Sequence, residues 1–166
     1  MKIKVLGEVF SGPWGGGNQF LKALKKEANR KGLYTSVPEE AEVLLFNSHH
    51  SFTEAMNLKE KYPEKIFIHR VDGPMNYRGK RGEKLDKKIF FLNSLIADGT
   101  IFQSQWSLEE TKKNHLVFSD LFTVIHNAPD PEIFFREKKN LKDFQHRKIK
   151  LVAVSWSTNP RKGFDI

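Results

Sequence analysis

Short apolar runs alternate with helical patterns along most of this 166-residue chain. Runs typical of buried strands lie at residues 2–9, 33–36, 43–46, 66–69, 100–103 and 123–126. Segments with apolar residues at helical spacing lie between most of them, at residues 18–31, 53–62 and 84–97 and from residue 107 onward. Because helices between strands act as right-handed crossovers, such strands pair in parallel. The pattern predicts an α/β fold, a Rossmann-like doubly wound parallel sheet, with the six strands in the order 3-2-1-4-5-6.

Polar or glycine-rich segments follow five of these predicted strands. They are the glycine loop after the first strand and the sequences NSHHS, HRVDG, SQWS and HNAPD after later ones. The carboxyl ends of parallel strands meet at one edge of a sheet, and ligands bind beyond that edge. We therefore expect the functional site to lie among these five segments.

The loop after the first strand, GPWGGGNQF, holds more glycine than a change of chain direction requires. Gly15, Gly16 and Gly17 precede a helix predicted from Asn18, whose free amide groups and dipole favour a phosphate or, better, a diphosphate. A flexible turn is the other interpretation. The spacing is not G-x-G-x-x-G, and no acidic residue ends the second predicted strand, so the loop argues against a dehydrogenase.

The composition limits the class of protein and its partners. The chain is 39% hydrophobic and has no cysteine, which supports a folded core and excludes disulfides, cysteine-bound zinc and a thiol nucleophile. The sequence shows neither a signal-peptide pattern nor a membrane-spanning run, so a cytoplasmic protein is expected. The net charge of +8 suits a polyanion, either a nucleoside diphosphate or an anionic membrane surface at which the protein is peripheral, and it also suits a merely solvated lysine-rich surface. Nucleic acid is not expected, because no recognition motif is present.

Five segments occur in an order that is similar to one enzyme family. They are GPWGGGNQF, IHRVDGP, ADGTIFQSQWS, VIHNAPDPEIF and NPRKGFDI. In these segments the chain resembles family four of the retaining, nucleotide-sugar-dependent glycosyltransferases, which have the GT-B fold. The resemblance implies two Rossmann-like domains across a cleft, the first for the acceptor and the second for the donor. It predicts an acceptor domain at residues 1–130, a linker at 131–147 and the truncated start of the donor domain at 148–166.

The resemblance also implies roles for single residues. His69 and Asp72 are the catalytic candidates, His69 as a contact of the sugar or acceptor hydroxyl and Asp72 as a hydrogen-bond acceptor for that hydroxyl. A structural histidine bonded to a neighbouring carbonyl is the other interpretation of His69. Lys162, with Arg161 beside it, is expected at the donor phosphates, and the amides of Gly15–Gly17 are expected to face either the donor diphosphate or the acceptor. A retaining front-face displacement lets the departing phosphate take the proton, so no protein base is required.

Other polar residues of these segments allow two interpretations. Arg70, Arg78 and Arg81 either bind an anionic acceptor or are solvated. His49 and His50 are adjacent on an extended segment, where their side chains point to opposite faces, and no third ligand is evident. No metal site and no resident cofactor are therefore expected.

Two features differ from the family's pattern. Ala128 and Pro129 follow Asn127, where the family usually has glycine after the asparagine. The family's two-glutamate motif, which grips the donor sugar and ribose, has no counterpart before Ile166. The first feature predicts a hinge backbone that differs from the family's common one, and the second falls in the donor domain.

The function that follows is transfer of a sugar from a nucleoside diphosphate sugar to a saccharide or lipid-linked acceptor, with retention, in polysaccharide or cell-envelope biosynthesis. This 166-residue chain is expected to be inactive by itself, because most donor contacts belong to the second domain. The competing interpretation is a non-catalytic Rossmann-like module that binds a polyanionic partner through its basic surface.

Overall fold

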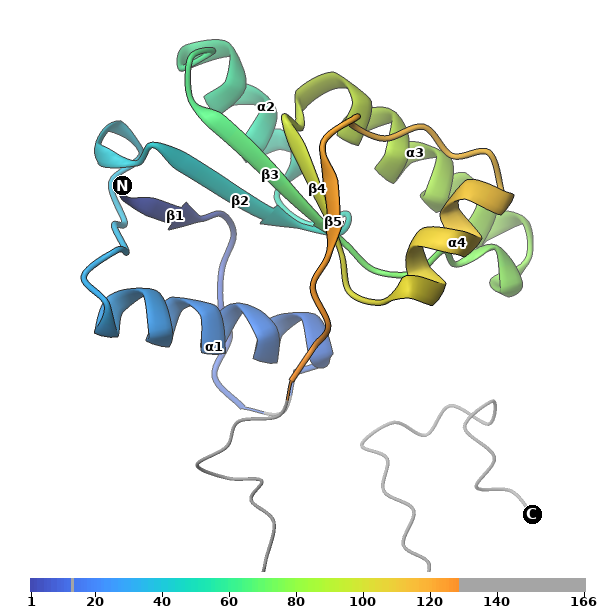
Figure 1. Ribbon diagram of the computed structural model, residues 1–166, viewed down its shortest axis with the longest axis horizontal. Helices are drawn as coiled ribbons and strands as arrows, with labels where there is room; N and C mark the ends of the chain where they lie inside the picture. The colour runs from blue at the N-terminus through green and yellow to red at the C-terminus, as the bar shows by residue number, and fades with distance from the viewer. Residues whose placement is uncertain (13, 129–166) are drawn as a thin grey trace, which may run out of the picture. The chain divides into compact units, whose positions relative to one another are not determined.

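The structure, a computed structural model, describes residues 1–12 and 14–128. Its centre is a sheet of five parallel strands in the order β1-β2-β3-β4-β5 (Figure 1). The strands are β1 (Ile3–Val5), β2 (Val43–Asn47), β3 (Ile66–Val71), β4 (Gly99–Phe102) and β5 (Phe122–Val124). The helices are α1 (Gly16–Arg30), α2 (Phe52–Lys61), α3 (Lys80–Ile96) and α4 (Gln105–Lys113), with short 3-10 helices at Pro38–Glu40 and Asn76–Arg78. The prediction of a parallel α/β fold is confirmed.

The predicted strand order is wrong among the first three strands. The segment at residues 43–47 does not lie at an edge, because it pairs with β1 on one side and with β3 on the other. Residues 33–36 do not form a strand, and Tyr34 makes a single parallel bridge with Ile3 on the outer side of β1. The reason is that β2 is an uninterrupted, almost fully buried run. Such a run is stabilised by cover on both faces, which the interior of a sheet supplies.

The side chains of the sheet alternate between two apolar layers. On one face, Val5 and Leu45 pack with Leu21 of α1. On the opposite face, Phe46 and Phe67 pack within a larger core to which the other three α-helices contribute. Figure 1 accordingly shows α1 on one side of the sheet and α2 and α3 on the other. The helix residues of the larger core are Phe52, Ala55, Ile89, Phe90, Leu92, Ile96 and Leu108.

The connections reverse at the carboxyl ends of β1 and β2. After β1 the chain passes through α1 on one face to the bridge at Tyr34, outside β1. After β2 it passes through α2 on the other face and continues to β3 (Figure 1). Because the two loops leave toward opposite faces, a crevice forms between them, which is the usual ligand position of a doubly wound sheet.

The helix starts agree closely with the sequence pattern in three helices. The helices α1, α2 and α4 begin within two residues of their predicted starts, whereas α3 begins at Lys80, four residues before the predicted residue 84. In the described ranges no helix combines the length and apolar character that crossing a membrane requires. The predicted linker at 131–147 and the donor segment at 148–166 lie outside the described residues.

Candidate functional site

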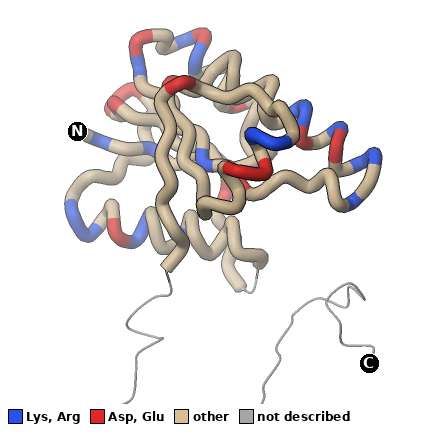
Figure 2. The backbone as a smooth tube through the Cα atoms, turned by 45° about the vertical axis from the view of Figure 1, so that its right-hand side comes forward, with Lys and Arg blue, Asp and Glu red and all other residues tan. Residues whose placement is uncertain are grey.

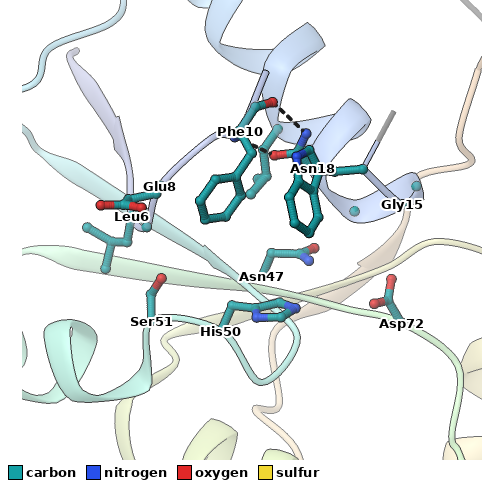
Figure 3. Close-up of a pocket in the computed structure, with 14 residues that line it drawn as sticks. Leu6, Glu8, Phe10, Gly15, Asn18, Asn47, His50, Ser51 and Asp72 are labelled. Carbon is teal, nitrogen blue, oxygen red and sulfur yellow. Dashed lines mark hydrogen bonds between the residues drawn. The ribbon is translucent and has the colours of Figure 1, made fainter. Parts of the chain in front are cut away.

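A cavity of about 550 Å³ lies at this reversal between β1 and β2 (Figure 3). Its walls are the β1–α1 loop with the start of α1, the turn after β2, and Asp72 after β3. Three of the five segments singled out in the sequence therefore meet there: the glycine loop, NSHHS and HRVDG. Among the described residues, SQWS and the first residues of HNAPD do not line this cavity.

The glycine loop forms the wall on the side of α1. Gly15 is the N-cap of α1, and Gly16 and Gly17 are its first two residues. No described side chain caps this end, and the first turn carries no acidic residue, so the helix leaves amide donors for another acceptor. A Cβ on Gly16 would meet no atom within 4 Å, whereas a Cβ on Gly17 would lie 3.1 Å from Nδ2 of Asn47. The start of α1 is thus open at Gly16 and packed closely against β2 at Gly17.

Asn18 holds the glycine loop in its conformation. Its Oδ1 accepts a hydrogen bond of 2.9 Å from the amide of Phe10, and its Nδ2 donates one of 3.0 Å to the carbonyl of the same residue. This closed pair sets the loop above the sheet (Figure 3). The rings of Phe10 and Trp14 then lie 5.2 Å apart and are 47% and 56% exposed. The loop therefore presents two adjacent aromatic rings at the cavity.

Arg70 lies behind the cavity, on the same face of the sheet as α1. Its guanidinium stacks over the ring of Phe20 at 4.1 Å, and the residue is only 2% exposed. One guanidinium nitrogen, Nη1, donates to Oδ1 of Asn47 at 2.6 Å and to Oδ1 of Asp72 at 3.1 Å. Arg70 is thus neither solvated nor open to an anionic acceptor.

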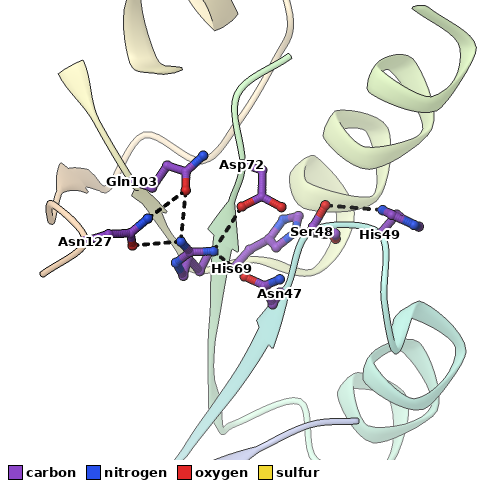
Figure 4. A network of polar contacts seen from close by, with 8 residues as sticks. Asn47, Ser48, His49, His69, Asp72, Gln103 and Asn127 are labelled. Atoms are coloured by element: carbon purple, nitrogen blue, oxygen red, sulfur yellow. Dashed lines mark hydrogen bonds and ion pairs between the residues drawn. The ribbon is translucent and has the colours of Figure 1, made fainter. Parts of the chain in front are cut away.

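The other guanidinium nitrogen of Arg70 reaches the far half of the sheet. Nη2 donates to Oε1 of Gln103 at 3.1 Å and to Oδ1 of Asn127 at 2.9 Å (Figure 4). The amide of Asn127 closes the network by donating to the same Gln103 oxygen at 3.0 Å. A single buried cation therefore joins the ends of β2, β3 and β4 to the segment that follows β5.

Asp72 is the predicted catalytic residue that lines the cavity. Its side chain is 38% exposed, and the ion pair with Arg70 fixes one of its oxygens. The other oxygen is available to accept a hydrogen bond, because a carboxylate has several lone-pair sites. Asn47 shares the same guanidinium nitrogen, so the geometry of Asn47 and Asp72 is set together.

His69, the other catalytic candidate, does not line the cavity. It is fully buried on the face of α2 and α3, stacked on Phe46 at 4.2 Å. Its Nε2 donates to the carbonyl of Ser48 at 2.8 Å, and its Nδ1 accepts from Nδ2 of Asn93 at 3.0 Å. Burial lowers the pKa of His69 to about 4, so the ring is neutral near pH 7. This geometry is that of a structural histidine bonded to a neighbouring carbonyl, and it does not support contact between His69 and a substrate.

The turn between β2 and α2 carries backbone strain beside the cavity. Ser48 and Ser51 have positive φ angles of 50° and 61°, although neither is glycine. Between them, the exposed rings of His49 and His50 lie 4.1 Å apart. Burial, followed by the neighbouring His50, lowers the pKa of His49. Within the described ranges, no group of three His, Asp or Glu side chains could hold a metal ion.

Comparison with known proteins adds nothing to this geometry. No protein-family model, curated protein or solved structure matches the chain.

Several residues of the site were not singled out in the sequence. The folded loop brings together Phe10, Trp14 and Asn18, and no short-range sequence pattern predicts its conformation. The central role of Arg70 has a sequence signal, because side chains alternate along a strand and Arg70 must face away from His69. Arg161 and Lys162, the predicted phosphate contacts, lie outside the described residues.

Proposed function

We propose that this chain is the acceptor-side part of a retaining GT-B glycosyltransferase, which transfers a sugar from a nucleoside diphosphate sugar to a saccharide or lipid-linked acceptor. The observation that carries the proposal is the cavity at the reversal, where the glycine backbone of α1 and the carboxylate of Asp72 line one space. The five family-like segments also support it, since four of them contribute residues to this cavity or to the Arg70 network behind it.

The chemistry follows from what these groups can do. Transfer breaks the bond between the anomeric carbon and the diphosphate oxygen and forms a bond to the acceptor oxygen, while the hydroxyl proton passes to the departing diphosphate. Asp72 accepts a hydrogen bond from the acceptor hydroxyl and is held for this by Arg70. Such positioning converts an encounter between two molecules into a reaction within one complex. No protein base is needed, and His69 has no part in this proposal.

The donor diphosphate has fewer contacts in the described residues. The amides of Gly15–Gly17 at the start of α1 are suited to a phosphate oxygen, because the helix dipole adds to their partial charge. The described cavity lining contains no lysine or arginine. Arg161 and Lys162, which the family resemblance implies as contacts of the donor phosphates, lie outside the described residues.

The substitution Gly16→Val tests the role of the glycine loop. A Cβ at Gly16 would meet no atom within 4 Å, so we expect the free energy of unfolding to change by less than about 1 kcal/mol. The valine side chain would occupy the space of a ligand, so binding is expected to be lost. Amide NMR shifts on titration with UDP-glucose, GDP-mannose and dTDP-glucose measure this directly.

The matched control places the same side chain elsewhere on the helix. Ala23 is exposed on α1 and does not line the cavity, so Ala23→Val should leave the shifts at Gly15–Gly17 intact. If no nucleoside diphosphate sugar perturbs these amides, or if Gly16→Val binds as the wild type does, the glycine loop is only a turn and the proposal fails.

A second candidate contact, with a polyanion, is favoured by α3. Figure 2 shows Lys and Arg segments interspersed with Asp and Glu segments around most of the fold. The helix α3, however, carries five exposed basic residues and a single exposed acidic residue, Glu83. Co-sedimentation with phosphatidylglycerol vesicles in low and high salt tests this contact. Binding to phosphatidylglycerol vesicles that is no stronger than binding to phosphatidylcholine vesicles would exclude it. The basic residues are Lys80, Arg81, Lys84, Lys87 and Lys88.

A further inference from the structure

The charge of the cavity differs in sign from the charge of the chain. The chain carries a net charge of +8, but the ionisable residues that line the cavity are Glu8, Asp72 and His50, without any lysine or arginine among the described lining residues. Arg70 compensates Asp72 from behind. For Glu8, which is exposed, the described residues provide no ion pair or hydrogen bond. A negative group on a sugar beside Glu8 would therefore meet an uncompensated carboxylate. The amides at the start of α1, which favour an anion, are assigned to the donor diphosphate, and lysines outside the cavity are screened beyond about 8 Å at physiological salt.

The aromatic and polar groups of the cavity suit a neutral polyol. The exposed rings of Phe10 and Trp14 offer apolar faces of the kind on which the C–H face of a pyranose packs. Opposite Phe10 in Figure 3 lie Asn47, His50 and Ser51, with Glu8 and Asp72 toward the two ends of the view. These groups include carboxylate and amide oxygens that accept hydrogen bonds from hydroxyls. Apolar rings with a few convergent polar groups are the usual composition of a small-molecule site.

We propose that this cavity binds an uncharged sugar as the acceptor, stacked on Phe10 and Trp14 and excluding acceptors with a carboxylate or phosphate on the same ring. The inference rests on the proposed function, because it names the acceptor class for the same site. It decides between the neutral and anionic acceptors that the sequence leaves open.

The experiment compares sugars that differ only in charge. The 166-residue chain is titrated with the methyl glycosides of glucose, galactose, mannose and N-acetylglucosamine, and with methyl glucuronide and glucose 6-phosphate. The indole N–H signal of Trp14, assigned by its loss in Trp14→Phe, reports binding. We expect at least one neutral glycoside to shift this signal, and methyl glucuronide to bind about tenfold more weakly than methyl glucoside because of one like charge nearby.

Two variants with matched controls test which residues cause the discrimination and the binding. Glu8→Gln removes the uncompensated carboxylate, so the discrimination against methyl glucuronide should largely disappear, whereas Glu64→Gln, in the turn before β3 at the opposite edge of the sheet, should keep it. Trp14→Ala should weaken binding of the neutral glycoside about tenfold, in line with the loss of a stacking contact. Trp106→Ala should leave the affinity unchanged, because Trp106 has a similar exposure of 55% but does not line the cavity.

The outcomes separate this inference from the function on which it rests. If methyl glucuronide or glucose 6-phosphate binds at Trp14 as tightly as the neutral glycosides, the uncharged acceptor is overturned, while shifts at Gly15–Gly17 with nucleoside diphosphate sugars would leave the transferase proposal standing. If none of the sugars shifts the Trp14 signal, the acceptor inference fails outright. If neither sugars nor nucleoside diphosphate sugars perturb the cavity, both proposals fail.

Discussion

At the scale of single residues, Arg70 illustrates how a buried charge can serve a site without contacting a ligand. Its guanidinium distributes four hydrogen bonds over Asn47, Asp72, Gln103 and Asn127. The planar guanidinium of an arginine can donate to several acceptors at once, and a lysine ammonium would not reproduce this geometry. The orientation of Asp72 in the cavity therefore depends on a residue that is itself hidden from solvent.

The variant Arg70→Met tests this dependence. Removing one partner from a buried network leaves the others uncompensated, so we expect the free energy of unfolding to fall by about 3 kcal/mol. Urea denaturation measures the change. Arg78→Met is the control, because Arg78 is exposed beside Tyr77, and its loss should cost no more than about 0.5 kcal/mol. Equal stabilities of the two variants would mean that the Arg70 network contributes little.

His69 makes a pH-dependent contribution to stability. The folded-state pKa of about 4 lies below the ordinary value of 6.5, so between these values the unfolded chain binds the additional proton. The free energy of unfolding should therefore fall as the pH is lowered from about 6.5 to about 4, by roughly 3 kcal/mol in total. Above pH 6.5 the contribution is constant.

Denaturation across this pH range measures the effect, and His69→Gln should lose this part of the slope. The control His126→Gln changes an exposed histidine and should keep it. If His69→Gln does not fold, NMR titration of the wild-type ring decides instead. A His69 ring that titrates near pH 6.5 in the folded protein would contradict the buried, neutral histidine described above.

At the scale of elements, the start of α3 is fitted closely to the 3-10 helix at Asn76–Arg78 that precedes it. The carboxylate of Asp86 accepts two hydrogen bonds from the amide of Met75, at 2.9 and 2.7 Å. Burial raises the pKa of this carboxyl. A Cβ on Gly82 would lie 1.8 Å from the carbonyl oxygen of Met75. Only glycine permits this contact, which positions the loop after Asp72.

The variant Gly82→Ala should consequently destabilise the fold although alanine favours helices. The clash is with backbone, so the loop must move, and we expect a loss of about 3 kcal/mol in the free energy of unfolding. Gly16→Ala is the matched control in the first turn of α1, where the added carbon meets no atom within 4 Å. Thermal or urea denaturation of both variants checks this, and a stable Gly82→Ala would show that α3 can dock without the close contact.

At the scale of the whole molecule, the sequence pattern predicted the parallel sheet and the edge where the cavity lies. The predicted order of the first three strands was wrong, although the continuous run Val43–Asn47 favours an interior position over an edge. Alternation along β3 likewise places His69 with Phe67 and Val71 on one face and Arg70 on the other. What the pattern could not predict is the pairing of Phe10 with Trp14, since it depends on a loop conformation set by Asn18.

The affinity of this chain for the donor tests most directly whether the proposed enzyme binds its donor mainly outside the described residues. The described cavity offers a diphosphate only the amides at the start of α1, without a lysine or arginine in its lining. Charge-assisted hydrogen bonds contribute roughly 1.5–3 kcal/mol each before the cost of ordering the ligand is subtracted. The dissociation constant should therefore be about 1 mM or weaker, equivalent to roughly 4 kcal/mol.

The decisive measurement is a calorimetric titration of the 166-residue chain with UDP-glucose, GDP-mannose and dTDP-glucose, with nucleotide release assayed in the same samples. An acceptor-side domain predicts millimolar or weaker binding of every donor and no release of nucleoside diphosphate, even with a saturating neutral glycoside. Micromolar affinity for a donor, or measurable turnover, would contradict it and show that this chain holds a complete donor site.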